Sequence, residues 1–143
     1  MKLFEISNYL DARVPLSFQE EYDNCGLLIG NKNHDISSIL VSLDCTEEVL
    51  DEAIQKNHNL IISHHPLIFG GVKKITRSNY VEKIIEKAIK NDIAIYAMHT
   101  NLDNIFGGVS FQIANKIGLQ EVKILKPKIS TLTKMTTYCP ASH

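Results

Sequence analysis

Several features that mark whole classes of protein are missing from this sequence. No apolar run is long enough to span a bilayer, so no membrane partner is expected. The formal net charge is −1, without the positive excess typical of proteins that bind nucleic acid. The amino-terminal stretch MKLFEISNYLDARVP is amphipathic and carries acids, unlike the apolar core of a signal peptide. We therefore expect a cytoplasmic protein.

Cysteine is scarce and widely spaced. The three cysteines, Cys25, Cys45 and Cys139, include no CxxC pair, which argues against a zinc ribbon and against a thioredoxin-like redox motif. We expect reduced thiols, most of them buried as small apolar groups.

The residues that are present predict one α/β domain. Apolar residues make up 44% of the 143 residues and charged residues 22%, an ordinary globular composition for a chain of one-domain length. Strand-like and helix-like stretches alternate, which favours a mainly parallel sheet with flanking helices. The expected helices are 3–13, 47–57, 79–91 and 109–117, and the expected strands are 25–30, 36–44, 59–63, 92–98 and 120–125. The strand over 36–44 is β-branched and apolar and is expected to be buried. Thr46 and Ser78 are expected to cap the second and third helices, and Gly118 to end the fourth.

A change of composition follows this domain. Pro127 opens a polar link, and TLTKMTTYCPASH then has the pattern of a new strand. We predict a metal-binding α/β domain over 1–126, followed over 127–143 by a linker and the first strand of a second half that is otherwise absent.

Two histidines stand where an apolar strand stops, in the stretch NLIISHHPLIFGG. The stretch MHTNLD follows the next expected strand, and a helix connects the two. The carboxyl ends of parallel strands meet at one edge of a sheet. His64, His65, His99 and Asp103 are therefore expected to be neighbours. Imidazole and carboxylate are ligands for zinc, iron, manganese or nickel.

Adjacent side chains in extended backbone point apart, so His64 and His65 suit two metal ions better than one. Two ions roughly 3.5–4 Å apart, bridged by a carboxylate such as Asp103, are typical of hydrolytic centres. The alternative is that the histidine pair lies on the surface and bonds loop carbonyls, with Thr100 and Asn101 as simple turn residues.

The sequence resembles the Ngg-interacting-factor-three-like family in three stretches: LDCTEEVLDEAI, NLIISHHPLIF and IYAMHTNLDNIFGGV. EYDNCGLLIG is similar to the family's amino-terminal signature, although Tyr22 stands where a tryptophan is expected. Bacterial members carry the label of type 2 homologues of GTP cyclohydrolase I. The resemblance implies a site for two divalent metal ions with His64, His65 and Asp103 among its ligands, and further ligands beyond residue 143. It also implies a homo-oligomer, a toroidal hexamer.

Other polar residues near this edge have two readings each. His99 is a tentative catalytic residue: an outer ligand, a base or a donor to substrate, or else a structural hydrogen-bonding group. Asp44 either orients a histidine or belongs to the start of a helix. Lys73, Lys74 and Arg77 form a basic run, either solvated or suited to a phosphate.

The leading hypothesis is a metal-dependent hydrolase of cyclohydrolase or phosphoesterase type, acting on a small molecule such as a nucleotide or phosphoester. One alternative is a non-catalytic metal-binding regulatory or scaffold protein. Another is an inactive truncated fragment.

Overall fold

A computed structural model describes residues 1–125 together with residues 135 and 137. Within these residues the strands form one sheet in the order β1-β4-β3-β2. Strands β2, β3 and β4 are parallel, which confirms the expected mainly parallel sheet, whereas β1 pairs with β4 in the antiparallel sense. The strands are β1 (Gly26–Ile29), β2 (Ile39–Ser42), β3 (Leu60–Ser63) and β4 (Ala94–Ala97).

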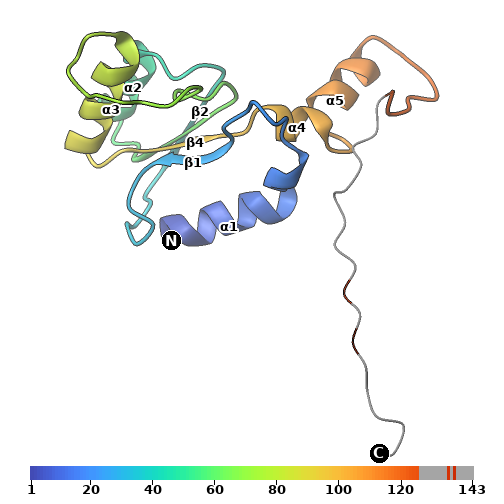
Figure 1. Cartoon of the computed structure of the whole chain (residues 1–143), viewed down its shortest axis with the longest axis horizontal. Helices are drawn as coiled ribbons and strands as arrows, with labels where there is room; N and C mark the ends of the chain where they lie inside the picture. The colour runs from blue at the N-terminus through green and yellow to red at the C-terminus, as the bar shows by residue number, and fades with distance from the viewer. Residues whose placement is uncertain (126–134, 136, 138–143) are drawn as a thin grey trace, which may run out of the picture.

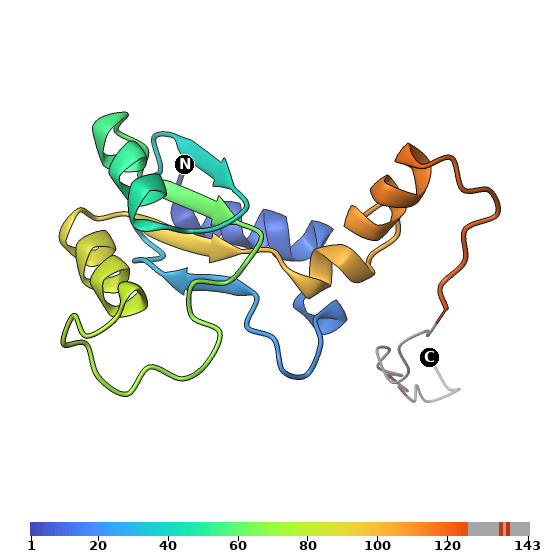
Figure 2. The same ribbon diagram turned by 90° about the horizontal axis from the view of Figure 1, so that it is seen from above.

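The helices lie on both faces of the sheet and beyond one of its ends. Helices α2 and α3 cover one face and α1 covers the other (Figure 1). Helix α4 lies beyond the ends to which β3 and β4 point (Figure 2). The helices are α1 (Leu3–Arg13), the 3₁₀ helix η1 (Leu16–Phe18), α2 (Glu47–Gln55), α3 (Tyr80–Lys90), α4 (Thr100–Asn104) and α5 (Val109–Lys116).

The alternation of side chains along the strands divides the core between the two faces. Ile61 and Ile95 pack with Leu50 of α2 and Ile84 of α3 in the larger cluster. Their sequence neighbours on the opposite face, such as Tyr96, pack against α1. This two-sided burial fixes the strand register, and with it the positions of the residues that follow each strand.

Two strand predictions need correction. Residues 120–125 form no strand and are exposed, and they pair with neither edge strand of the sheet, β1 or β2. The strand predicted over 36–44 is an edge strand rather than a buried one, and Val41 is 77% exposed. Helix α1 covers the sheet beneath the other strands but leaves this edge open.

The amino terminus of α3 differs from the prediction in its capping residue. Asn79, not Ser78, is the N-cap, and its side chain accepts a hydrogen bond from the Glu82 amide. The Glu82 carboxylate in turn accepts from the Ser78 and Thr76 amides. These backbone hydrogen bonds lower the pKa of Glu82 to about 2. At the start of α2, Thr46 caps as predicted.

We expect Glu82→Gln to destabilise the fold more at neutral pH than in acid. The folded-state pKa lies below the ordinary value, so the ionised carboxylate stabilises the fold fully above about pH 5, and this contribution is lost as the pH falls. Urea unfolding of both proteins between about pH 7 and pH 3 measures the effect. Glu121→Gln, at an exposed position after α5, is the matched control. A Glu82 effect that does not shrink in acid would contradict this account.

Two further predictions concern position in the cell and the end of the chain. Between residues 1 and 125, no helix has the length and apolar character needed to cross a bilayer.

The strand expected within 127–143 and the thiol of Cys139 lie outside the described residues. The division into 1–126 and 127–143 stays a prediction.

Candidate metal centre

Strands β3 and β4 deliver the candidate residues to one edge of the sheet. The strands are parallel, with Ser63 opposite Ala97 as the last registered pair. The chain continues this pairing for one more step, since the Met98 amide donates to the Ser63 carbonyl at 2.9 Å. His64 directly follows β3, and His99 follows β4 after Met98. The two histidines therefore lie close together at the same edge of the sheet.

Three imidazole rings converge at this point. The ring centroids of His64 and His65 lie 5.1 Å apart, and the His99 ring lies 5.2 Å from the first and 5.5 Å from the second. One ligand nitrogen from each ring lies within 4.8 Å of the others. This cluster could hold a metal ion.

Each of the three rings is held through its Nδ1 by an oxygen atom. The partners are the Met98 carbonyl for His64 at 2.8 Å, an Asp44 carboxylate oxygen for His65 at 2.7 Å and an Asp23 carboxylate oxygen for His99 at 3.0 Å. A carbonyl or an ionised carboxylate can only accept, so Nδ1 carries the hydrogen in every ring. In the neutral rings the lone pair is then on Nε2, the tautomer that binds a metal through Nε2.

Asp103 places a carboxylate beside this cluster, next to His64. It lies in the first turn of α4, and its Oδ1 is 3.8 Å from Nε2 of His64. Both side chains keep some exposure, 29% for Asp103 and 21% for His64. The structure thus brings together the four residues that the sequence predicts as neighbours: His64, His65, His99 and Asp103.

Asp44 contacts a histidine rather than serving the start of a helix. The helix-start role belongs to Thr46, whose side chain accepts from the Val49 amide. Asp44 instead holds the His65 ring, with the carboxylate 55% and the imidazole 48% exposed. Of the two readings left open by the sequence, the structure favours the one in which Asp44 orients His65.

Asp23 is a site residue that sequence reasoning missed. Its side chain is fully buried, and it bonds His99 Nδ1, the Thr100 amide and the Thr100 hydroxyl. Burial disfavours the charged carboxylate. The hydrogen bonds from Thr100, His99 and Cys25 outweigh this effect and hold the pKa of Asp23 well below its usual value. The available signal was EYDNCGLLIG, the stretch that resembles the family signature.

Thr100 and Asn101 are more than turn residues. They begin α4 and are buried, Asn101 completely. The Asn101 amide group donates to the Val14 carbonyl at 3.1 Å, and Thr100 accepts from the Glu20 amide at 2.9 Å. These bonds tie the helix that carries Asp103 to residues 14–25.

We expect Gly108→Ala to disturb Asp103 from a distance. A Cβ at Gly108 would lie 1.9 Å from the carbonyl oxygen of Leu102, the residue before Asp103, so α4 has to move. The expected cost is about 1–3 kcal/mol of stability together with weaker metal binding. Gly71→Ala is the matched control, because its Cβ would meet nothing within 4 Å. Urea unfolding and zinc titration measure both effects, and equal behaviour of the two variants would contradict the prediction.

The sequence matches the Duf34/NIF3 (NGG1p interacting factor 3) family over residues 1–141. The chain belongs to this family. Its fold agrees with the solved structure of a Bacillus cereus protein related to NIF3, with a TM-score of 0.83 and 47% identity. That likeness covers 90% of this chain and 35% of the other. Reduced HcgD from Methanocaldococcus jannaschii is also similar, with a TM-score of 0.79 and 29% identity over 86% of this chain and 49% of that one.

Curated relatives carry a more specific name. A Staphylococcus epidermidis protein called "GTP cyclohydrolase 1 type 2 homolog" is 44% identical over all 143 residues. A Staphylococcus aureus protein of the same name is equally similar. The chain spans 39% of the length of each of these relatives.

Proposed function

We propose that this chain supplies the metal-binding part of a metal-dependent hydrolase that acts on a nucleotide or phosphoester. The carrying observation is the set of three imidazoles, each with Nδ1 held by an oxygen and one ligand nitrogen within 4.8 Å of the others. The name of the 44% identical relatives supports cyclohydrolase chemistry as one form of this activity.

The donor set fits a divalent cation. Neutral imidazole and carboxylate are ligands of zinc, iron, manganese and nickel alike. The oxygen partners of Nδ1 hold the rings before any ion arrives, which lowers the entropic cost of binding. His64, His65 and Asp103 would hold the metal, and two ions are part of the proposal because the adjacent histidines and a bridging Asp103 suit a pair.

A bound divalent ion would supply Lewis acidity, lowering the pKa of a water molecule and polarising the bond to be cleaved. The chain's own residues have separate tasks. Asp44 and the Met98 carbonyl orient the ligand rings. His99, held by buried Asp23, is placed to bind the metal or to exchange a proton with substrate. We also propose that the full-length protein forms a homo-oligomer, which the family resemblance suggests is a hexamer.

The test uses the complete polypeptide encoded by the gene, reconstituted separately with zinc, iron, manganese and nickel. Turnover of GTP or of bis(p-nitrophenyl) phosphate that depends on metal and is lost in His65→Ala is the expected result. Metal retained without turnover of either substrate would overturn the hydrolase and favour the regulatory or scaffold role. Light scattering of the same sample measures the oligomeric state.

A further inference from the structure

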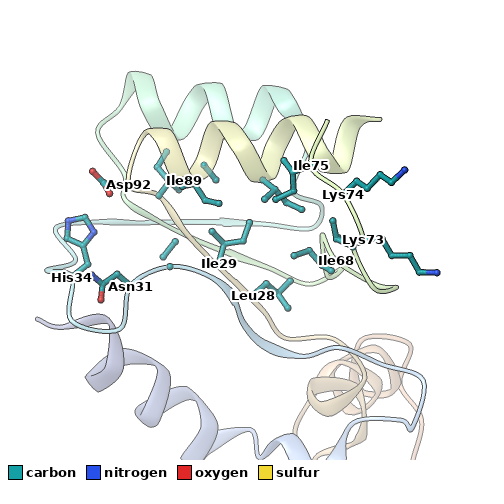
Figure 3. A pocket seen from close by; sticks show the side chains of 16 residues that line it. Leu28, Ile29, Asn31, His34, Ile68, Lys73, Lys74, Ile75, Ile89 and Asp92 are labelled. Carbon is teal, nitrogen blue, oxygen red and sulfur yellow. The ribbon is translucent and has the colours of Figure 1, made fainter. Parts of the chain in front are cut away.

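An apolar groove lies away from the metal centre, between strand β1, helix α3 and the segment that joins β3 to α3 (Figure 3). Its volume is about 810 Å³, within the range of small-molecule sites. None of the four metal-centre residues lines it. An inference about the groove therefore stands apart from the proposed function.

The groove walls between its two ends are mostly aliphatic. Leu28 and Ile29 of β1 form one wall, and Ile85 and Ile89 of α3 form another. Two aliphatic side chains of the groove are largely exposed: Ile89 at 57% and Ile75, on the joining segment, at 52%. Aliphatic surface gathered in a concave site gains free energy when an apolar ligand covers it.

The two ends of the groove differ in charge. Lys73 and Lys74 stand at one mouth, while Asn31, His34 and Asp92 stand at the other (Figure 3). Within residues 1–125, neither lysine has a carboxylate within ion-pair distance. Arg77, the third member of the basic run, pairs instead with Glu86 at 2.8 Å. The lysine end thus has positive charge available for a ligand.

We propose that this groove binds an elongated aliphatic monocarboxylate of the fatty-acid class. The chain of the ligand lies along the isoleucines, and its carboxylate remains at the surface beside Lys73 and Lys74. Charge complementarity sets the direction of binding, because the opposite end carries Asp92. The same asymmetry discriminates against a ligand with a carboxylate at both ends, whose second charge would have to enter the aliphatic groove or meet Asp92.

Calorimetric titration of the chain with dodecanoate tests the proposal. We expect one molecule to bind per chain with a dissociation constant on the order of 10–100 µM. Dodecanol lacks the charged head group, and dodecanedioate carries a second carboxylate at its other end. Both are expected to bind about tenfold more weakly than dodecanoate. Isoleucine methyl NMR gives the location, with shifts expected at Ile75, Ile85 and Ile89.

Two variants test separately the role of the lysine charges and the role of the aliphatic wall. Lys73→Gln combined with Lys74→Gln is expected to weaken dodecanoate about tenfold and to leave dodecanol unchanged. Ile89→Glu, at an exposed position, is expected to block the groove for both ligands while the circular dichroism and melting temperature stay close to wild type. Lys116→Gln combined with Lys123→Gln removes the same charge elsewhere and is the matched control.

The proposal is overturned if dodecanoate does not bind, or if it binds without shifting the groove methyls. It is also overturned if dodecanol binds as well as dodecanoate and the double lysine variant behaves like its control. That pattern would mean that the groove takes up apolar chains without using its lysines to recognise a carboxylate. Zinc binding by each groove variant, expected at the wild-type level, keeps this result separate from the metal-centre proposal.

Discussion

Replacing His64 with alanine is expected to lower zinc affinity at least about a hundredfold. Loss of a residue that only orients a metal ligand typically costs 10–100-fold, and loss of the ligand itself costs more. His64 is the central member of the cluster, since its ring lies about 5 Å from both other imidazoles and its Nε2 lies 3.8 Å from Asp103. Elemental analysis and zinc titration of the purified variant measure the loss.

The same measurements on other variants refine this result. Asp103→Ala is expected to lower metal content even more if this carboxylate bridges two ions, since both would be lost. His34→Ala, in a polar loop and outside the cluster, is the matched control. Wild-type metal content in both His64→Ala and Asp103→Ala would place the site elsewhere. Thermal stability without metal is expected to change little, because residues after strand ends contribute little to the core.

Asp23→Asn is expected to weaken both the fold and the metal centre. The buried carboxylate accepts from His99 and from two groups of Thr100. An amide of the same shape has one accepting oxygen, so its NH₂ group faces a donor and a buried hydrogen bond is lost. We expect a loss of about 2–4 kcal/mol in the free energy of unfolding and about 10–100-fold in zinc affinity.

Urea unfolding without metal and zinc titration of the folded variant separate these two effects. Asp92→Asn, which makes the same change at an exposed position, is the matched control. If the Asp23 variant lost stability but bound zinc normally, Asp23 would be a structural residue and His99 would not need its partner for the metal centre.

The arrangement of the candidate metal centre was predictable because it depends on one rule of topology. Two parallel strands joined by a helix end at the same edge, so the residues after Ser63 and Ala97 meet. Apolar periodicity was sufficient to identify those strands. It was not sufficient for residues 120–125, because a local pattern does not determine whether a segment docks against a sheet edge, and here the segment stays exposed and unpaired.

The residues that support the candidate metal centre were harder to predict from the sequence. Asp23 lies in a segment without helical or strand periodicity, and its role depends on β1 pairing in the antiparallel sense with β4. Asparagine is common in turns, yet Asn101 is buried. Its side-chain amide donates a hydrogen bond to the carbonyl of Val14, a residue far away in the sequence. Such long-range hydrogen bonds leave no local pattern, so only the family signature pointed to this region.

The hydrogen bond between Asp23 and His99 joins residues 76 positions apart in the chain. Closing so long a loop is entropically costly, and the contact therefore forms only when many other native contacts form with it. During synthesis, the His99 ring cannot be fixed until the ribosome has released β4 and β1 has docked against it. His64 and His65 leave the ribosome before β4 and His99, so the nascent chain for a time carries the histidine pair without its third partner. The three-imidazole arrangement is therefore complete only once β1, β3 and β4 have paired, so the candidate site is a product of the whole sheet rather than of any one segment.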